Sequence, residues 1–157
     1  MLMALDLATR TGMAVGGFGS RPVTSSVDCG GRTGGARYAH LQDWLSDQIA
    51  VHQPQVLVCE APIMMDHRSA DTALLTVGLL AVVELTAARS GLIRPVFTLP
   101  VSTIRKAFCG TGRAKKHDVA QRCAQLGFSP RDDNEADALA CWYVAINHSP
   151  DIRAALR

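Results

Sequence analysis

The chain has few aromatic residues, no closely spaced cysteines and no low-complexity tract. Aromatic residues make up 5% of its 157 residues and apolar residues 48%, so we expect a core built mainly from Leu, Val, Ala and Ile. The five cysteines are odd in number and lack the spacing of a zinc knuckle, which argues against a disulfide framework or a zinc site. We expect them to act as small apolar residues in a reducing compartment. No signal peptide is expected either, because Asp6 interrupts the first apolar run too early.

Acidic residues are absent between Glu84 and Asp118. The net charge is only +2, which does not by itself imply a nucleic-acid partner, but the distribution of charge is uneven. The cations in this interval are Arg89, Arg94, Arg105, Lys106, Arg113, Lys115 and Lys116. Such asymmetry predicts one basic region on an otherwise mixed surface. The alternative is an ordinary solvated helix face.

The length predicts one domain over residues 1–157, and hydrophobic periodicity predicts its elements. We expect strands at Met1–Ala8, Gly12–Phe18, Val23–Cys29, Gln55–Glu60 and Arg94–Leu99, and helices at Ala36–Gln53, Ala70–Arg89, Val101–Phe108, Ala114–Leu126 and Asp132–His148. The glycine-rich segment 30–35 matches no phosphate-loop pattern and is interpreted as a flexible connection. Three meander strands followed by alternating helices and strands predict a mixed α/β sheet with helices on its faces.

The predicted helix Ala70–Arg89 is apolar all round at its centre, Ala73–Val83. A membrane span is the first alternative, but spans need roughly 20 uninterrupted apolar residues, and Asp71 and Glu84 bound this run well short of that. We therefore expect no membrane partner and a helix buried on two sides, by the sheet and by a second subunit.

Three acids each lie on an otherwise apolar element: Asp6 in the first strand, Glu60 at the end of the fourth, and Asp137 in the last helix. Unpaired carboxylates are unfavourable in an apolar layer. Asp6 alone is equally explained as a strand-end acid that caps a turn. Asp132 and Glu135 have a sufficient explanation as a capping box at the start of the last helix.

Neighbouring first and fourth strands would put Asp6 and Glu60 side by side, and the last helix would deliver Asp137. Clustered carboxylates repel one another unless cations bind among them, and hard oxygen ligands favour Mg²⁺ or Mn²⁺. Two such ions roughly 4 Å apart would clamp a phosphodiester for in-line hydrolysis.

These acids lie in segments that resemble the RuvC-type Holliday junction resolvases of the RNase H-like superfamily, most of all the compact phage or prophage members. The segments that carry the resemblance are Leu5–Gly12, Val56–Glu60, Ser69–Leu74, Gly110–Lys116 and Ala136–Ala140. It implies an RNase H-like mixed five-stranded sheet and a homodimer that nicks two strands of a four-way DNA junction symmetrically. It also implies that Asp6, Glu60 and Asp137 are catalytic residues that bind two Mg²⁺ ions, with Mn²⁺ as a possible substitute.

The chain departs from the family pattern at Asn134, where relatives carry Asp or His three residues before the last acid. An amide oxygen binds Mg²⁺ without contributing charge, so the second metal site would be weaker. Asp133 shares the helix face with Asn134 and Asp137, and it is left open whether Asn134 or Asp133 supplies the fourth ligand.

The basic region would contact DNA. The resemblance aligns Arg105 and Lys116 with family lysines close to the scissile phosphate, where Lys116 would act in catalysis. Lys106, Arg113, Lys115 and Arg122 would bind phosphates of the junction arms. In the loop after Glu60, Met64 and Arg68 are further candidates for DNA contact. The apolar residues 63–65 could wedge between base steps or pack under the long helix.

The sequence thus predicts a cytoplasmic, Mg²⁺-dependent resolvase of four-way DNA junctions, in a bacterial cell or a phage-infected host. It names no helicase partner. One alternative, motivated by Asn134, is a branched-DNA-binding module with weak or no catalysis. The other is an RNase H-like nuclease that acts on flaps, forks or RNA-containing duplexes.

Overall fold

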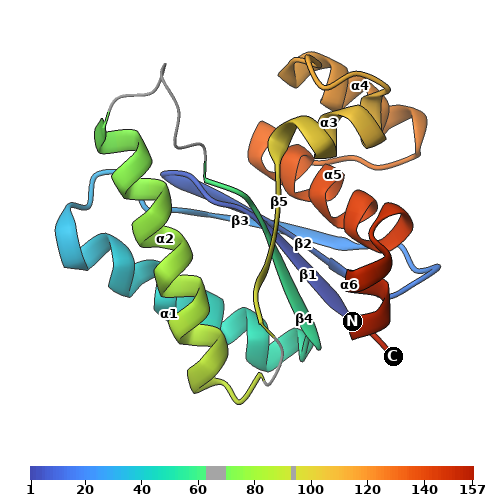
Figure 1. Ribbon diagram of the computed structural model, residues 1–157. Coiled ribbons are helices and arrows are strands. Elements are labelled where there is room, and N and C mark those ends of the chain that lie inside the picture. Colours follow the sequence, from blue (N-terminus) through green and yellow to red (C-terminus); the bar gives the residue numbers. More distant parts are fainter. Residues whose placement is uncertain (63–69, 93–94) are drawn as a thin grey trace.

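The centre of the molecule is a mixed five-stranded sheet with the strand order β3-β2-β1-β4-β5 (Figure 1). The computed structural model describes residues 1–62, 70–92 and 95–157. The strands are β1 (Leu2–Asp6), β2 (Arg10–Gly16), β3 (Val23–Asp28), β4 (Val56–Glu60) and β5 (Phe97–Leu99). The first three form the expected antiparallel meander, while β4 pairs parallel with β1 and β5 with β4. The prediction of a mixed sheet is confirmed.

Helices cover both faces of this sheet (Figure 1). On one face lie α1 (Gly34–His52) and α2 (Ala70–Arg89). On the other lie α3 (Val101–Cys109), α4 (Lys116–Gln125), α5 (Asp133–His148) and α6 (Pro150–Ala155). Helix α6 was not predicted, although Ser149 and Pro150 are typical of an N-cap and a first helical position.

The alternating pattern of β1 and β4 decides where their terminal acids point. In β1, Leu2 and Ala4 pack in the core beneath α5, while Met3 and Leu5 pack in the core beneath α1 and α2. Since side chains alternate along a strand, the next residue, Asp6, faces α5. Val56 and Val58 of β4 occupy the α5 side in the same way, so Glu60 follows them there.

The register of the sheet confirms that the first and fourth strands are neighbours. Leu5 pairs with Cys59 in the parallel ladder, so Asp6 and Glu60 follow at matching positions. The predicted start of the second strand at Gly12 is wrong, because β2 begins at Arg10. Gly12 lies within β2 and pairs with Asp6.

Some element boundaries also differ from the prediction. Strand β5 begins at Phe97, whereas the predicted start, Arg94, lies outside the described residues. Helix α4 begins at Lys116 rather than Ala114, because the N–H of Lys115 binds Asp118 Oδ2 at 2.7 Å and caps the helix there.

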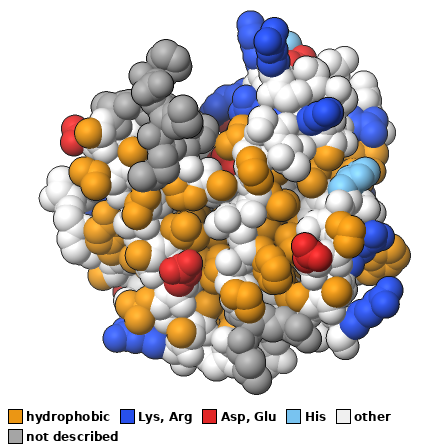
Figure 2. Space-filling model, in the orientation of Figure 1, with side chains coloured by type: hydrophobic (Ala, Val, Ile, Leu, Met, Phe, Trp, Pro, Cys, Tyr) orange, Lys and Arg blue, Asp and Glu red, His pale blue; other side chains and the backbone are white. Residues whose placement is uncertain are grey.

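Helix α2 packs one side against the sheet and exposes the other. Leu79 and Val83 are fully buried, so the expected burial by the sheet is confirmed. Leu74, Val77 and Leu85 are 69%, 41% and 46% exposed, and Figure 2 shows apolar side chains gathered over α2. By length and composition α2 would also qualify as a membrane span, but core helices of soluble proteins pass the same test.

Candidate active site

One cavity at the carboxyl ends of β1 and β4 brings the predicted acids together. Asp6 and Glu60 line it from the strand ends, and Asn134 and Asp137 line it from α5. The cavity has a volume of about 240 Å³. The rest of its wall is formed by Leu7, Ala8, Ala61, Thr76, Val101, Arg105 and Lys116. Residues from widely separated parts of the chain therefore meet here, as the sheet register requires.

Asp133 lies outside this wall. Its side chain is exposed, and its Oδ2 forms an ion pair with Lys116 Nζ at 3.3 Å. Of the two candidates for a fourth ligand, the structure brings Asn134 to the cavity, whereas Asp133 binds the lysine at its rim.

The electrostatics of the cavity favour a bound cation. Burial raises the pKa of the Asp137 carboxyl, and the charges of Arg105 and Lys116 oppose that shift only in part. Burial raises the pKa of the Cys141 thiol, one turn further along α5, and the carboxylates of Glu60 and Asp6 contribute to the rise. Burial disfavours the ionised form of Asp137, and a cation bound beside it would favour that form.

The donor set fits magnesium or manganese. Within the described residues, no three His, Cys, Asp or Glu side chains lie close enough together to hold a metal ion without other ligands. Mg²⁺ does not need such a group, because it keeps several waters and uses one or two carboxylates together with substrate phosphates. Carboxylate and amide oxygens are the ligands that such hard cations prefer.

A close contact between Gly12 and α5 sets the position of the helix over the strand ends. A Cβ atom at Gly12 would collide with the backbone carbonyl of Asn134. Only glycine lets the first turn of α5 lie this close to β2. Because Gly12 pairs with Asp6, the same contact brings Asn134 and Asp137 to the cavity.

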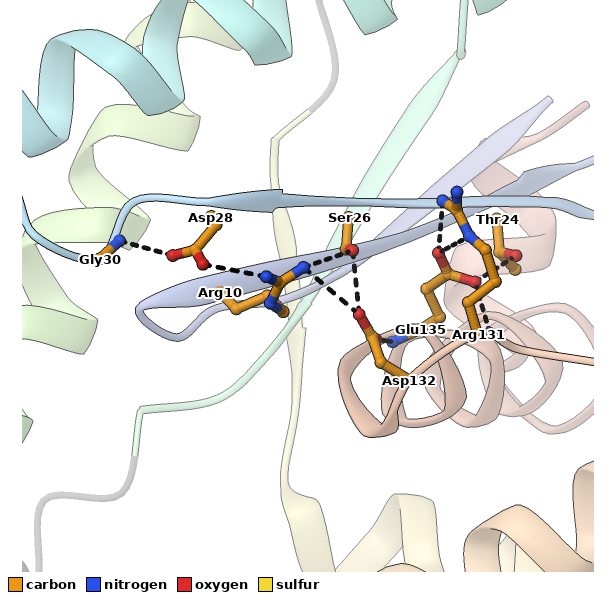
Figure 3. A network of polar contacts seen from close by, with 8 residues as sticks. All are labelled: Arg10, Thr24, Ser26, Asp28, Gly30, Arg131, Asp132 and Glu135. Atoms are coloured by element: carbon orange, nitrogen blue, oxygen red, sulfur yellow. Dashed lines mark hydrogen bonds and ion pairs between the residues drawn. The ribbon is translucent and has the colours of Figure 1, made fainter.

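A buried carboxylate fixes the start of α5 to the edge of the sheet (Figure 3). Glu135 is fully buried. Its carboxylate accepts hydrogen bonds from the hydroxyl of Thr24 at 2.8 Å and from Nε of Arg131 at 2.8 Å. Burial alone would raise the pKa of Glu135, but the hydrogen bonds of Arg131 and Thr24 hold it below its usual value.

The predicted capping box is therefore only half right. Asp132 is the N-cap of α5, and its Oδ1 accepts from the N–H of Glu135 at 2.8 Å. The Glu135 carboxylate binds the N–H of Arg131 at 3.0 Å rather than that of Asp132. The four-residue spacing of Arg131 and Glu135 was the available signal for this ion pair.

Replacing Glu135 by Gln is expected to destabilise the protein by about 2–3 kcal/mol, because the buried partner of Arg131 loses its charge and an amide group then faces donors. Thermal or urea denaturation measures the change. Asp47→Asn, on the exposed side of α1, is the matched control and should unfold like the wild type. Equal stability of Glu135→Gln and the wild type would contradict this role.

The basic candidates lie beside the cavity, on α3 and the segment leading into α4. Lys106, Arg113 and Lys115 are exposed, and Figure 2 shows Lys and Arg side chains over this region. Arg105 is half-buried, and its Nη1 donates to the carbonyl of Ala114 at 2.8 Å. Arg122 donates from Nε to the carbonyl of Phe108 at 3.2 Å, which ties α4 to the end of α3.

Two of the predicted DNA contacts, Met64 and Arg68, lie outside the described residues. All five cysteines are free, and all except the half-buried Cys109 are buried in the core, as expected of small apolar residues.

A family model matches most of the chain. Residues 23–148 match the model of a family described as crossover junction endodeoxyribonuclease RuvC. No curated protein sequence is significantly similar to the chain.

Two solved structures share the fold. The structure of Thermus thermophilus RuvC is 23% identical over 99% of this chain and 96% of that one, with a TM-score of 0.75. The T. thermophilus RuvC in complex with Holliday junction substrate is 22% identical over 94% and 96%, with a TM-score of 0.76. The predicted RNase H-like fold of the RuvC type is therefore confirmed.

Proposed function

The chain belongs to the crossover junction endodeoxyribonuclease RuvC family, and we propose how its residues resolve Holliday junctions. The observation that carries the proposal is the convergence of Asp6, Glu60 and Asp137 on one cavity that also contains Arg105 and Lys116. This arrangement combines carboxylates that can bind divalent metal ions with basic side chains that can bind a phosphate. It suits hydrolysis of a phosphodiester.

Asp6, Glu60 and Asp137 would hold two Mg²⁺ ions, with Asn134 as a neutral fourth donor. Bound there, Mg²⁺ or Mn²⁺ would supply an activated water and neutralise charge on the leaving oxygen. Asn134 contributes no charge, so we expect the site to bind its second ion more weakly than a site with four carboxylates.

Lys116 and Arg105 would bind the scissile phosphate. Lys116 is 60% exposed and loosely paired with Asp133 at 3.3 Å, so it can turn from that carboxylate to a phosphate oxygen. Arg105 is held in place by the Ala114 carbonyl. Preorganised cations offset the charge that develops in the transition state. Lys106, Arg113 and Lys115 continue this basic surface away from the cavity and would bind the arms.

A homodimer is the proposed working form. Symmetric nicks need two active sites related by a two-fold axis, and the exposed apolar side chains of α2, Leu74, Val77 and Leu85, offer a surface for a second copy. The proposed substrate would be met in the cytoplasm of a bacterium or of a phage-infected host.

The proposal is tested with wild-type protein on a labelled mobile four-way junction, in Mg²⁺, in Mn²⁺ and in EDTA. Flap, fork, RNA–DNA duplex and plain duplex substrates serve as competitors. We expect symmetric paired nicks at the junction in both metals and none in EDTA.

Two results would contradict the proposal. Preferred cleavage of flaps, forks or RNA-containing duplexes would point to another RNase H-like nuclease. Tight junction binding without nicks in either metal would identify a binding module, and Asn134 would then mark a lost site.

A further inference from the structure

A second group of cations lies at the edge of the sheet beyond β2, outside the basic region of α3 and α4. It consists of Arg10 at the start of β2, Arg32 in the glycine-rich segment after β3, and Arg37 in the first turn of α1. We call these three residues the arginine group. Arg32 Nη1 donates to the carbonyl of Asp28 at 3.2 Å, and Arg37 Nη2 donates to the carbonyl of Arg32 at 2.6 Å.

The charges of this group are incompletely neutralised. Arg10 pairs with Asp28 at 2.9 Å and approaches Asp132 at 3.7 Å (Figure 3). Among the described residues, neither Arg32 nor Arg37 forms an ion pair with a carboxylate; both bind backbone carbonyls instead. The sequence has no acid between Asp28 and Asp43, so this segment keeps a positive charge.

The start of α1 adds to the attraction for anions. Its N-cap, Thr33, makes no side-chain hydrogen bond to the helix, and no acid occupies the first turn. The first N–H groups of a helix lack intrahelical partners and carry partial positive charge. A basic side chain is unfavourable at this end of a helix, and an anion bound there would offset the charge of Arg37.

The arginine group lies at the same end of the sheet as the cavity. Arg10 pairs with Asp28 across β2 and β3, and the N–H of Cys29 donates to the carbonyl of Thr9 at 2.8 Å. The cavity wall, Asp6 to Ala8, leads directly into this hairpin. The end of β3 is therefore level with the catalytic end of β1.

The N-terminus of α5 separates the two groups of cations. On one side Asp132 forms an ion pair with Arg10. On the other side the adjacent Asp133 forms an ion pair with Lys116. In the described part of the chain, the buried side-chain polar atoms without a hydrogen-bond partner are Nε of Arg37 and Nε of Arg105, one in each group.

We propose that Arg32 and Arg37, held in place beside Arg10, form a second contact surface for the DNA phosphate backbone, on the opposite side of the active site from α3 and α4. This inference rests on the proposed function and adds a second DNA-binding surface to it. The DNA backbone would then run over both sides of the cavity. The glycine-rich segment would let phosphates approach closely, because it carries few side chains.

The test measures binding of a four-way junction without divalent metal over a series of salt concentrations. For Arg32→Gln with Arg37→Gln we expect the slope of log K against log salt to fall by about 2, because each lost phosphate contact removes about 0.9. Affinity at low salt should fall about 10- to 100-fold. Arg32→Lys with Arg37→Lys keeps the charges and should restore most of the slope, which a purely structural role would not predict.

Arg153→Gln with Arg157→Gln, at the α6 end of the chain away from the catalytic strand ends (Figure 1), is the matched control and should keep the wild-type slope. If the double Gln variant does not fold, Arg32→Gln alone, whose side chain is exposed, should lower the slope by about 1. A wild-type slope in a folded Gln variant overturns this inference while junction cleavage by the wild type stands. Failure of the wild type to bind junctions overturns the proposed function as well.

Discussion

Asn in place of Asp6, or in place of Asp137, is expected to lower junction cleavage by a factor of about 1000 or more. Such a factor corresponds to roughly 4 kcal/mol of transition-state stabilisation, which is the loss expected if these carboxylates hold the metal ions of the proposed site. Binding should persist or tighten, because removing a negative charge reduces repulsion of the phosphates. Single-turnover cleavage and electrophoretic binding assays measure the two effects separately.

Asp133→Asn provides the matched control for this prediction. It makes the same chemical change one turn before Asp137, at an exposed carboxylate paired with Lys116 rather than in the cavity wall. We expect less than a tenfold change in cleavage, because exposed ion pairs contribute little. If Asp133→Asn were as inactive as Asp137→Asn, the fourth ligand would be Asp133 and the assignment of Asn134 would be wrong.

Gly12→Ala should disable the enzyme without changing any charged group. The added methyl group collides with the Asn134 carbonyl, so the first turn of α5 must move away from β2. Forced overpacking of this kind costs about 1–3 kcal/mol, and displacement of catalytic groups by about 1 Å can reduce the rate about 100-fold. Denaturation curves and single-turnover cleavage measure the two losses.

Gly17→Ala is the control for Gly12. A Cβ atom at Gly17 would meet Ser20 Oγ at 3.7 Å, an ordinary contact, so both stability and activity should be close to those of the wild type. Wild-type activity in Gly12→Ala would mean that the close contact between β2 and α5 does not position the site.

Much of the fold was predictable because each strand and long helix carries a strong local pattern. The apolar runs of β1 and β4 and the periodicity of the long helices predicted most elements in the right order. The short helix α6 and the exact start of β2 were missed because such boundaries depend on a few hydrogen bonds that periodicity does not report.

The acids of the site were predictable because each interrupts an apolar element, and the sheet register brings them together. Two features were beyond sequence reasoning. The sequence predicts Glu135 as part of a capping box, yet its carboxylate is fully buried and binds Thr24, distant in sequence, and Arg131. The role of Gly12 depends on the approach of α5 to β2, a tertiary contact without a local signature.

Cleavage of a supercoiled plasmid that carries an extruded cruciform, followed through time by gel electrophoresis, distinguishes paired nicks from single ones. Two coordinated nicks across the junction convert the supercoiled plasmid directly to the linear form. The account of paired metal sites in a homodimer predicts linear product in Mg²⁺ with little nicked-circle intermediate. Accumulation of nicked circles alone, or no cleavage in Mg²⁺ and in Mn²⁺, would contradict it.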